Sequence, residues 1–328
     1  MKILSLIVLF SAFVLTTQAQ ETVFLAPVLL VKKEKEDGFQ KVWLTAATKT
    51  AIRYRELEAS DTTKDARISD FRSIYIYEPR EYATAIDLYQ ARKYKEAKQM
   101  FTTVKERYKP ILPMENSPAA MATFYEMECM RKLGDLDGLA AALQTFIKDP
   151  LTRETQLRQL ELYVLWDAVR TKSWDRLEIL ARERAATPMP GDQRAQVAYC
   201  HGLALEGVNR PKEALFAYSI ATTADAGASE EIARPAALRI LAIHNADPEV
   251  KNAMKVWGTP DENKNSKGHS DLKEAAAVAK LFEMSLGAGT PLPAEYKAFL
   301  KYLDPAVKTA KAEKTEKPAE KVEKPAEK

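Results

Sequence analysis

Apolar residues recur at helical spacing along most of the chain, beginning near Arg80. In the segment 94–108 the apolar positions Tyr94, Ala97, Phe101 and Val104 are separated by three, four and three residues. Residues at this spacing share one face of an α-helix. The segment is therefore predicted to be an amphipathic helix that buries one apolar stripe.

The same pattern returns three more times. The second copy has Leu136, Leu139, Leu143 and Phe146 at the four positions, the third has Trp174, Leu177 and Ala181, and the fourth has Pro211, Ala214, Tyr218 and Ala221. Successive copies are 42, 38 and 37 residues apart, which leaves room for two helices and a turn. Repeats of this length are typical of helical solenoids, in which each unit buries its apolar face against its neighbours. The sequence thus predicts a mainly α protein whose helix pairs form an α-solenoid.

The units resemble the tetratricopeptide repeat (TPR), whose second helix carries an aromatic residue, Ala, an aromatic residue and Ala at these offsets. The matching residues are Tyr94, Ala97 and Phe101 in the first copy and Ala214, Tyr218 and Ala221 in the fourth, with Gly202 at the small position of the preceding helix. The resemblance covers residues 80–225 and implies TPR-like helix pairs over 80–258. Leu139 and Leu177 depart from it by replacing a small residue, and well-placed prolines follow the second helix only at Pro110 and Pro150. The repeats are also longer than the roughly 34 residues of the family.

A different pattern precedes the helices. Residues 22–79 contain β-branched and aromatic runs with stretches of period-two alternation, and these predict a small β-rich module of three or four strands. The runs are 41–46, 50–57 and 66–78, separated by the turn sequences EDG (36–38) and TTKD (62–65). Residues 22–31 fit either an edge strand or an extended linker. So short a module buries little surface alone, so we expect it to pack against the helices that follow.

The remaining helical segments complete the predicted domain organisation. Residues 154–170 and 194–207 are apolar around most of the helix circumference, as expected for first helices that pack on both flanks. A fifth pair is predicted at 229–245 and 248–258, with Ser229 as N-cap. Residues 261–270 form a polar loop, and helices at 271–287 and 294–303 are expected to cap the stack within the segment 259–305.

The N-terminus indicates export. Lys2 is followed by an apolar run from Ile3 to Leu15 and by the small-x-small sequence 17–19. This order is typical of a secretory signal peptide, predicted here at 1–19 and removed near Ala19. The mature chain is then expected to lack a transmembrane segment and to be periplasmic or secreted. The alternatives are an uncleaved anchor and a buried helix.

Charge and composition narrow the range of partners. The formal net charge is +3, and residues 306–328 contribute seven Lys and five Glu to it, so the folded body is close to neutral. A nearly neutral body without a basic stripe argues against nucleic-acid binding. The Lys/Glu/Pro-rich segment 306–328 has few apolar groups and is predicted to be a disordered tail, either a tether to wall polymers or a solubilising spacer.

No motif for catalysis or cofactor binding emerges from the sequence. GxSxG, GxxxxGK[ST] and GxGxxG after a strand do not occur. Cys129 and Cys200 fall in helical patterns two repeats apart and are expected to be buried thiols rather than a disulfide. His201, His244 and His269 lack metal-ligand spacing. We therefore expect no cofactor and no metal, although Ser, His and Asp residues could still converge in the folded chain.

The TPR resemblance implies a concave groove that the first helices line. The groove residues that it implies are Tyr82, Tyr89, Phe124, Glu128, Arg131, Gln159, Tyr163, Trp166, Arg170, Gln196, Tyr199 and Glu206. Aromatic residues mixed with Arg and Gln suit peptide recognition, although any of these rings could instead pack between helices. The sequence-based hypothesis is a noncatalytic scaffold for a protein or peptide partner in the cell envelope. An envelope hydrolase and a self-assembling structural subunit are the alternatives, and the oligomeric state is left open.

Overall fold

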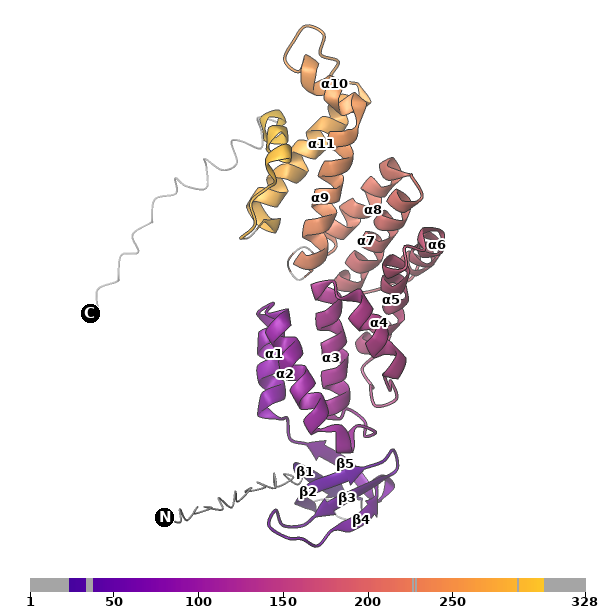
Figure 1. Ribbon diagram of the computed structural model, residues 1–328, viewed down its shortest axis with the longest axis vertical. Coiled ribbons are helices and arrows are strands. Elements are labelled where there is room, and N and C mark those ends of the chain that lie inside the picture. The colour runs from indigo at the N-terminus through magenta and orange to yellow at the C-terminus, as the bar shows by residue number, and fades with distance from the viewer. Residues whose placement is uncertain (1–23, 34–37, 226, 228, 288, 304–328) are drawn as a thin grey trace, which may run out of the picture. The chain divides into compact units, whose positions relative to one another are not determined.

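The computed structural model describes residues 24–33, 38–225, 227, 229–287 and 289–303 (Figure 1). Within these residues the protein is mainly helical, and a small antiparallel sheet precedes the helices. The predicted signal peptide (1–19) and tail (306–328) lie outside the described residues and stay predictions.

The N-terminal sheet has five strands in the order β4-β3-β2-β1-β5. These are β1 (Ala26–Lys32), β2 (Phe39–Ala47), β3 (Ala51–Arg55), β4 (Lys64–Arg67) and β5 (Phe71–Ile76). All neighbouring strands are antiparallel. The sequence-based count of three or four strands was therefore too low.

Strand β1 lies inside the sheet, so the prediction of an edge strand or linker for residues 22–31 was wrong. Val28 lies opposite Val42 of β2 and opposite Ile76 of β5. Val28 and Leu30 are completely buried, because alternate side chains of a strand point to the same face of the sheet. A strand at this position needs apolar side chains, which explains its continuous apolar sequence.

Strand β4 begins in the predicted turn 62–65 and ends in the first two residues of the strand predicted at 66–78. Its sequence, KDAR, has no apolar alternation, so the hydrophobic pattern gives no sign of a strand. Asp65 of β4 instead accepts a 2.8 Å hydrogen bond from Arg53 of β3. Charged residues are usual on an edge strand, where they discourage pairing with other chains. A 3₁₀ turn, η1 (Ile68–Asp70), then separates β4 from β5 and divides the strand predicted at 66–78.

Helices make up the rest of the described chain. They are α1 (Arg80–Gln90), α2 (Tyr94–Arg107), α3 (Pro118–Leu133), α4 (Leu136–Thr145), α5 (Glu154–Arg170), α6 (Trp174–Ala185), α7 (Gly191–Gly207), α8 (Pro211–Thr223), α9 (Glu230–Ala246), α10 (Pro248–Val256) and α11 (Lys267–Leu281). Shorter elements are the 3₁₀ helices η2 (Lys109–Ile111) and η4 (Ala294–Tyr302) and a π-helical turn, η3 (Phe282–Leu286). Strand β2 packs against η2, as expected for a sheet too small to stand alone.

Four helix pairs turn with the same backbone geometry. One residue with positive φ follows the first helix of each pair: Arg92 (60°) after α1, Gly134 (74°) after α3, Lys172 (53°) after α5 and Asn209 (61°) after α7. In the third turn Lys172 N–H donates to Val169 O at 3.1 Å and Ser173 N–H to Ala168 O at 2.9 Å, and the other three turns repeat this pattern. This is the Schellman arrangement, which satisfies the last carbonyls of a helix. The four turns are 42, 38 and 37 residues apart, so the predicted repeat spacing is confirmed.

The central positions of the predicted apolar stripes are buried, whereas Pro211 is exposed and Tyr94, Leu136, Leu143, Phe146 and Trp174 are half-buried. Ala97, Phe101, Leu139, Leu177 and Tyr218 are all at most 2 % exposed. From α5 to α9 each helix packs against the next, and α5 also contacts α7 while α7 contacts α9. First helices therefore pack on first helices, as repeat packing requires, while the solenoid arrangement itself stays a prediction.

The C-terminal elements pack on the last helix pair. Leu272 of α11, Phe282 of η3 and Phe299 of η4 share a core with residues of α9 and α10. The polar loop is shorter than predicted, because Ser266 caps α11 by accepting a 3.2 Å hydrogen bond from His269 N–H. Ser229 stands at the N-cap position of α9, but its hydroxyl bonds Asp225 at 2.8 Å instead of a helix amide.

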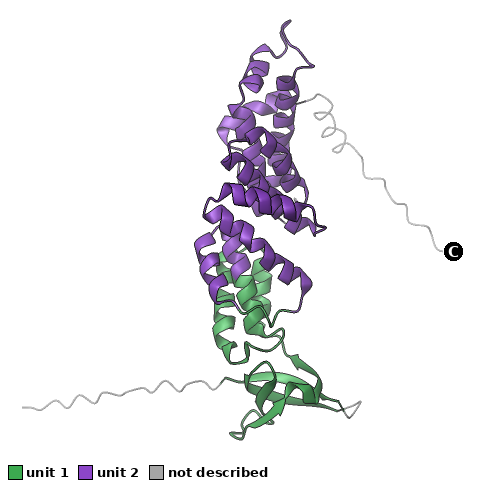
Figure 2. Cartoon of the chain, turned by 90° about the vertical axis from the view of Figure 1, so that its right-hand side faces the viewer, with its two compact units in different colours: residues 1–126, 147–151 green, residues 127–146, 152–328 purple. Residues whose placement is uncertain are grey.

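The chain divides into two compact units (Figure 2). Unit 1 comprises residues 1–126 and 147–151, which include the sheet, α1 and α2. Unit 2 comprises residues 127–146 and 152–328, which include α4 to α11. The boundary falls within α3.

Candidate binding surface

In unit 1 the predicted groove aromatics belong to a cluster of rings around Tyr125. The Tyr125 ring stacks on Phe101 at 5.4 Å between centroids and makes T-shaped, edge-to-face contacts with Tyr89 and Phe124 at 5.3 Å each. Tyr82 joins the cluster at 6.4 Å from Tyr125. Edge and offset contacts at these separations are the favourable ones for aromatic pairs. These rings therefore help to hold α1, α2 and α3 together, and of the three groove aromatics only Tyr89 is half-exposed.

In unit 2 the predicted groove residues of α3 and α5 form a buried charged network. Arg131 donates to both carboxylate oxygens of Glu128 at 3.0 and 2.9 Å, and the Tyr163 hydroxyl donates to Glu128 at 2.7 Å. The Arg131 guanidinium also lies 5.7 Å from the ring centroid of Trp166, within cation–π range. Its side chain is only 2 % exposed. Arg131 is thus a buried structural residue and not the solvated groove cation that the sequence suggested.

The same network reaches a helix 100 residues further along the chain. Glu231, in the first turn of α9, lies 3.5 Å from Arg131 and forms an ion pair with Lys132. Burial alone would raise the pKa of Glu128, but Arg131 lowers it by charge and by hydrogen bonds, and the net pKa is lowered. Burial alone would lower the pKa of Arg131, yet Glu128 and Glu231 raise it. Both groups are therefore held in their charged forms.

A pair of glutamines joins α5 to α7. Gln159 and Gln196 exchange two amide hydrogen bonds of 3.0 Å, and Trp166 Nε1 donates to Gln196 Oε1 at 3.1 Å. All three side chains are buried. Each buried polar atom in this pairing gains a partner, which removes the cost of leaving it unsatisfied.

Four of the twelve predicted groove residues remain partly exposed. They are Tyr89, Arg170, Tyr199 and Glu206, whereas Tyr82, Phe124, Glu128, Arg131, Gln159, Tyr163, Trp166 and Gln196 are buried. Arg170 pairs with Asp167 at 2.8 Å and with Asp137 at 3.3 Å. The predicted groove residues of unit 2 therefore lie close together, but most of them are buried by contacts with one another.

The exposed members of unit 2 continue onto α9 through Arg239. The Arg239 guanidinium lies 3.2 Å from Glu206, and the Tyr218 hydroxyl donates to the same carboxylate at 2.6 Å. Burial raises the pKa of Tyr218, and its hydrogen bond to Glu206 raises it further. Burial also raises the pKa of Tyr199. We call the set Arg170, Tyr199, Glu206 and Arg239 the exposed rim.

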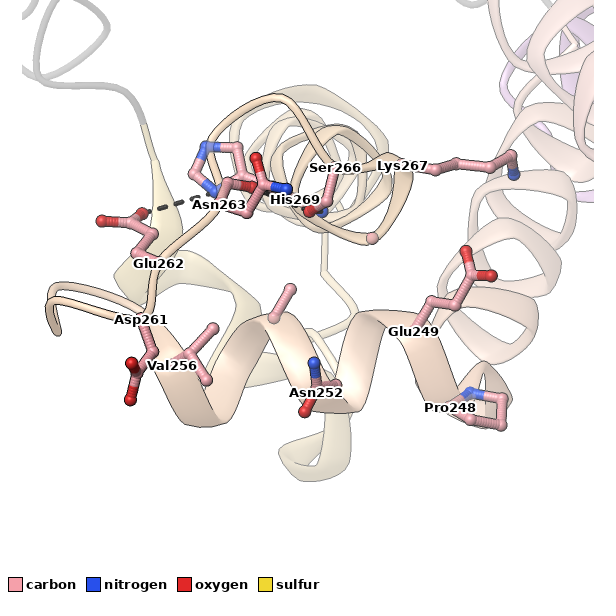
Figure 3. A pocket seen from close by; sticks show the side chains of 12 residues that line it. Pro248, Glu249, Asn252, Val256, Asp261, Glu262, Asn263, Ser266, Lys267 and His269 are labelled. Carbon is pink, nitrogen blue, oxygen red and sulfur yellow. Dashed lines mark hydrogen bonds and ion pairs between the residues drawn. The ribbon is translucent and has the colours of Figure 1, made fainter.

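A separate polar pocket of about 500 Å³ lies between α10 and the start of α11 (Figure 3). It brings together Ser266, His269 and Glu262, with Glu262 3.4 Å from His269 Nδ1. This is the kind of convergence that a hydrolase would need. The Ser266 hydroxyl, however, donates to Asn263 O at 2.8 Å and caps α11. The His269 ring stacks on Trp257 at 4.8 Å. The hydroxyl proton therefore points to a backbone carbonyl, and these contacts give Ser266 a structural task.

The two cysteines are buried and are not joined by a disulfide, in agreement with the sequence. Burial raises the pKa of the Cys200 thiol to about 12, so it is not a reactive thiolate. Among the described residues, no three His, Cys, Asp or Glu side chains are grouped to hold a metal ion. In the same part of the chain, no helix combines the length and apolarity needed to cross a membrane.

Comparison with known proteins identifies no relative: no family model, curated protein or solved structure matches the chain.

Two residues of this surface escaped the sequence reasoning. Glu231 lies 3.5 Å from Arg131 although the two residues are 100 positions apart in the sequence. A pair so far apart leaves no local sequence pattern. Arg239 lies on the exposed, polar side of α9. Nothing in the sequence distinguishes it there from any other solvated residue. Its proximity to Glu206 depends on the packing of α9 against α7.

Proposed function

We propose that this protein is an exported, noncatalytic scaffold of TPR-like helix pairs that binds a protein or peptide partner in the cell envelope. The observation that carries the proposal is the repeated hairpin, with the same positive-φ turn at four positions spaced 42, 38 and 37 residues apart. Arrays of such units typically serve as extended binding surfaces, because each pair adds side chains to one continuous face.

Within unit 2 the exposed rim is the best candidate for the contact surface. Its residues lie on α5, α7 and α9, of which α7 packs on both others. Tyr199 and the two arginines are residue types that often dominate binding energy. The Arg239 side chain is 50 % exposed and that of Arg170 is 33 % exposed, so both can exchange their present acidic partners for a carboxylate of the partner.

The buried network beneath the rim keeps the rim in place. Trp166 lies 6.3 Å from Tyr199 between ring centroids, and Tyr218 lies 5.9 Å from it. Tyr199 is thus held between two rings whose polar atoms are hydrogen-bonded. A side chain that is already fixed loses less entropy on binding, which favours affinity.

The test is a capture experiment from envelope extract with wild type, Arg170→Ala and Arg239→Ala. We expect both variants to remain folded and to recover clearly less of the partner than wild type does. Arg158→Ala is the matched control, because Arg158 is an exposed arginine on α5 that pairs with Glu154, one turn away on the same helix, at 2.6 Å. Equal recovery by all four proteins would reject the exposed rim as the binding surface.

One structural observation favours self-assembly as the second candidate function. Strand β5 is an outer strand of the sheet. Its sequence FRSIYI has one charged residue, whereas β4, with the sequence KDAR, has three. Unpaired apolar edges can add a strand from another chain. Crosslinking in intact cells that yields only adducts between copies of this chain would favour assembly over partner binding.

A further inference from the structure

A second cavity in unit 2 has the chemistry of a ligand site, and it is independent of the function proposed above. It measures about 460 Å³ and lies between the end of α6, α7 and α8. Its floor consists of Val197, Ala198 and Ala217, all of which are buried. Cavities of this size with mostly apolar walls are typical of small-molecule sites.

The walls of the cavity combine one exposed ring with two basic groups. Phe216 of α8 is 76 % exposed and forms one side, although a ring of this size usually finds cover in a folded protein. Arg194 and His201 of α7 both line the cavity. They are seven residues apart, which is about 10 Å along a helix. The cavity therefore extends along α7 from Arg194 to His201.

The charge in this cavity is one-sided. None of its twelve lining residues is acidic. Within the described part of the chain no carboxylate forms an ion pair with Arg194, unlike most arginines of unit 2. Burial lowers the pKa of His201; Glu178 opposes this effect, and Arg182 and Arg210 add to it. Arg194 is therefore the permanent cation of the cavity, and the group that complements it is an anion.

We propose that this cavity binds an aliphatic carboxylate, with the hydrocarbon chain between Phe216 and the Val197–Ala198 floor and the carboxylate on Arg194. The hydrocarbon chain packs against the apolar floor and the Phe216 ring, because this contact removes the apolar surfaces of both ligand and protein from water. The guanidinium takes the carboxylate, since its paired N–H donors match that geometry. The sequence gives one hint of the site: Phe216 lies off the stripe of Ala214, Tyr218 and Ala221.

The experiment is a calorimetric titration of the purified chain with sodium decanoate, and with 1-decanol as the neutral analogue. We expect one decanoate per chain and an affinity for decanol at least about tenfold weaker, as removal of a charge-assisted hydrogen bond predicts. Arg194→Gln should weaken decanoate binding about tenfold and leave decanol binding unchanged. Phe216→Ala should weaken the binding of both ligands.

Both substitutions fall on exposed side chains, so the melting temperature of each variant should equal that of wild type. Arg153→Gln is the matched control, because Arg153 is an exposed arginine of the same unit outside the cavity. Its affinity for decanoate should equal that of wild type. The proposal is overturned if decanoate does not bind, if decanol binds as tightly, or if Arg194→Gln binds decanoate like wild type.

Discussion

At the scale of single residues, the close approach of α7 to α8 depends on a missing side chain. A Cβ atom at Gly202 of α7 would lie 2.4 Å from Cε1 of Tyr218 on α8. The Tyr218 ring is completely buried and its hydroxyl is hydrogen-bonded to Glu206, so the ring has little freedom to move away. Only glycine permits this approach, which explains the glycine at position 202.

Gly202→Ala should therefore destabilise the protein by about 1 to 3 kcal/mol, the usual cost of overpacking a core. The free energy of unfolding in urea measures the effect. In a Tyr218→Ala background the same substitution should cost much less, because the ring that it strikes is gone. If Gly202→Ala unfolds at the wild-type urea concentration in the Tyr218 protein, the packing of α7 on α8 described here is wrong.

The buried Glu128–Arg131 pair gives a second prediction at this scale. Arg131→Met should cost about 3 to 5 kcal/mol, since it leaves Glu128 buried without its counter-charge. Arg170→Ala, which removes an exposed pair, should have a far smaller effect, because exposed ion pairs contribute little to stability. Thermal and urea unfolding of the two variants distinguish these effects. Similar losses in both would mean that Arg131 is not buried as described.

The pH dependence of stability follows from the same pair. The pKa of Glu128 in the folded state lies below its ordinary value of 4.5. The unfolded state therefore binds more protons as the pH falls, and the stabilisation that is present above pH 4.5 is lost as the pH falls through the folded-state pKa. Urea unfolding between pH 6 and 3 should show a shallower fall in stability for Glu128→Gln than for wild type. Identical slopes would mean that Glu128 is not the group responsible.

At the scale of elements, the repeated turns place unfavourable residues in a left-handed conformation. Lys172 has φ 53°, where a residue with a Cβ atom is strained, whereas Gly134 fills the equivalent position of the preceding pair without strain. Lys172→Gly should therefore stabilise the protein by about 1 kcal/mol, and Lys172→Ala should have little effect because alanine keeps the Cβ atom. The melting temperatures of these two variants test the prediction. A lower melting temperature for Lys172→Gly would contradict the turn geometry.

The sequence predicted the elements whose pattern is local. The stripes around Phe101 and Tyr218 lie in helices as predicted, because burial of one helix face leaves a period that can be counted. Strand β4 was missed because an edge strand needs no apolar side chains. The burial of Arg131 was missed because Glu231, which lies against it, is 100 residues away. Pairings of this kind depend on how helices pack, and no single segment encodes them.

At the scale of the whole molecule, only part of the surface predicted from the repeated helix pairs is free to bind. Contacts within the chain occupy most of the predicted groove and leave the exposed rim. Those contacts fix Tyr199 between Trp166 and Tyr218. We propose that a partner contacts the chain at Tyr199.

The most direct measurement places a photo-crosslinking amino acid at position 199 or, as control, at position 158, and illuminates intact cells. Residue 158 is exposed on α5 and lies outside the exposed rim. We expect position 199 to yield a discrete adduct with one other protein, position 158 to yield none, and Arg170→Ala to weaken the adduct at 199. Adducts of equal yield at both positions, or adducts only between copies of this chain, would show that no partner binds at Tyr199.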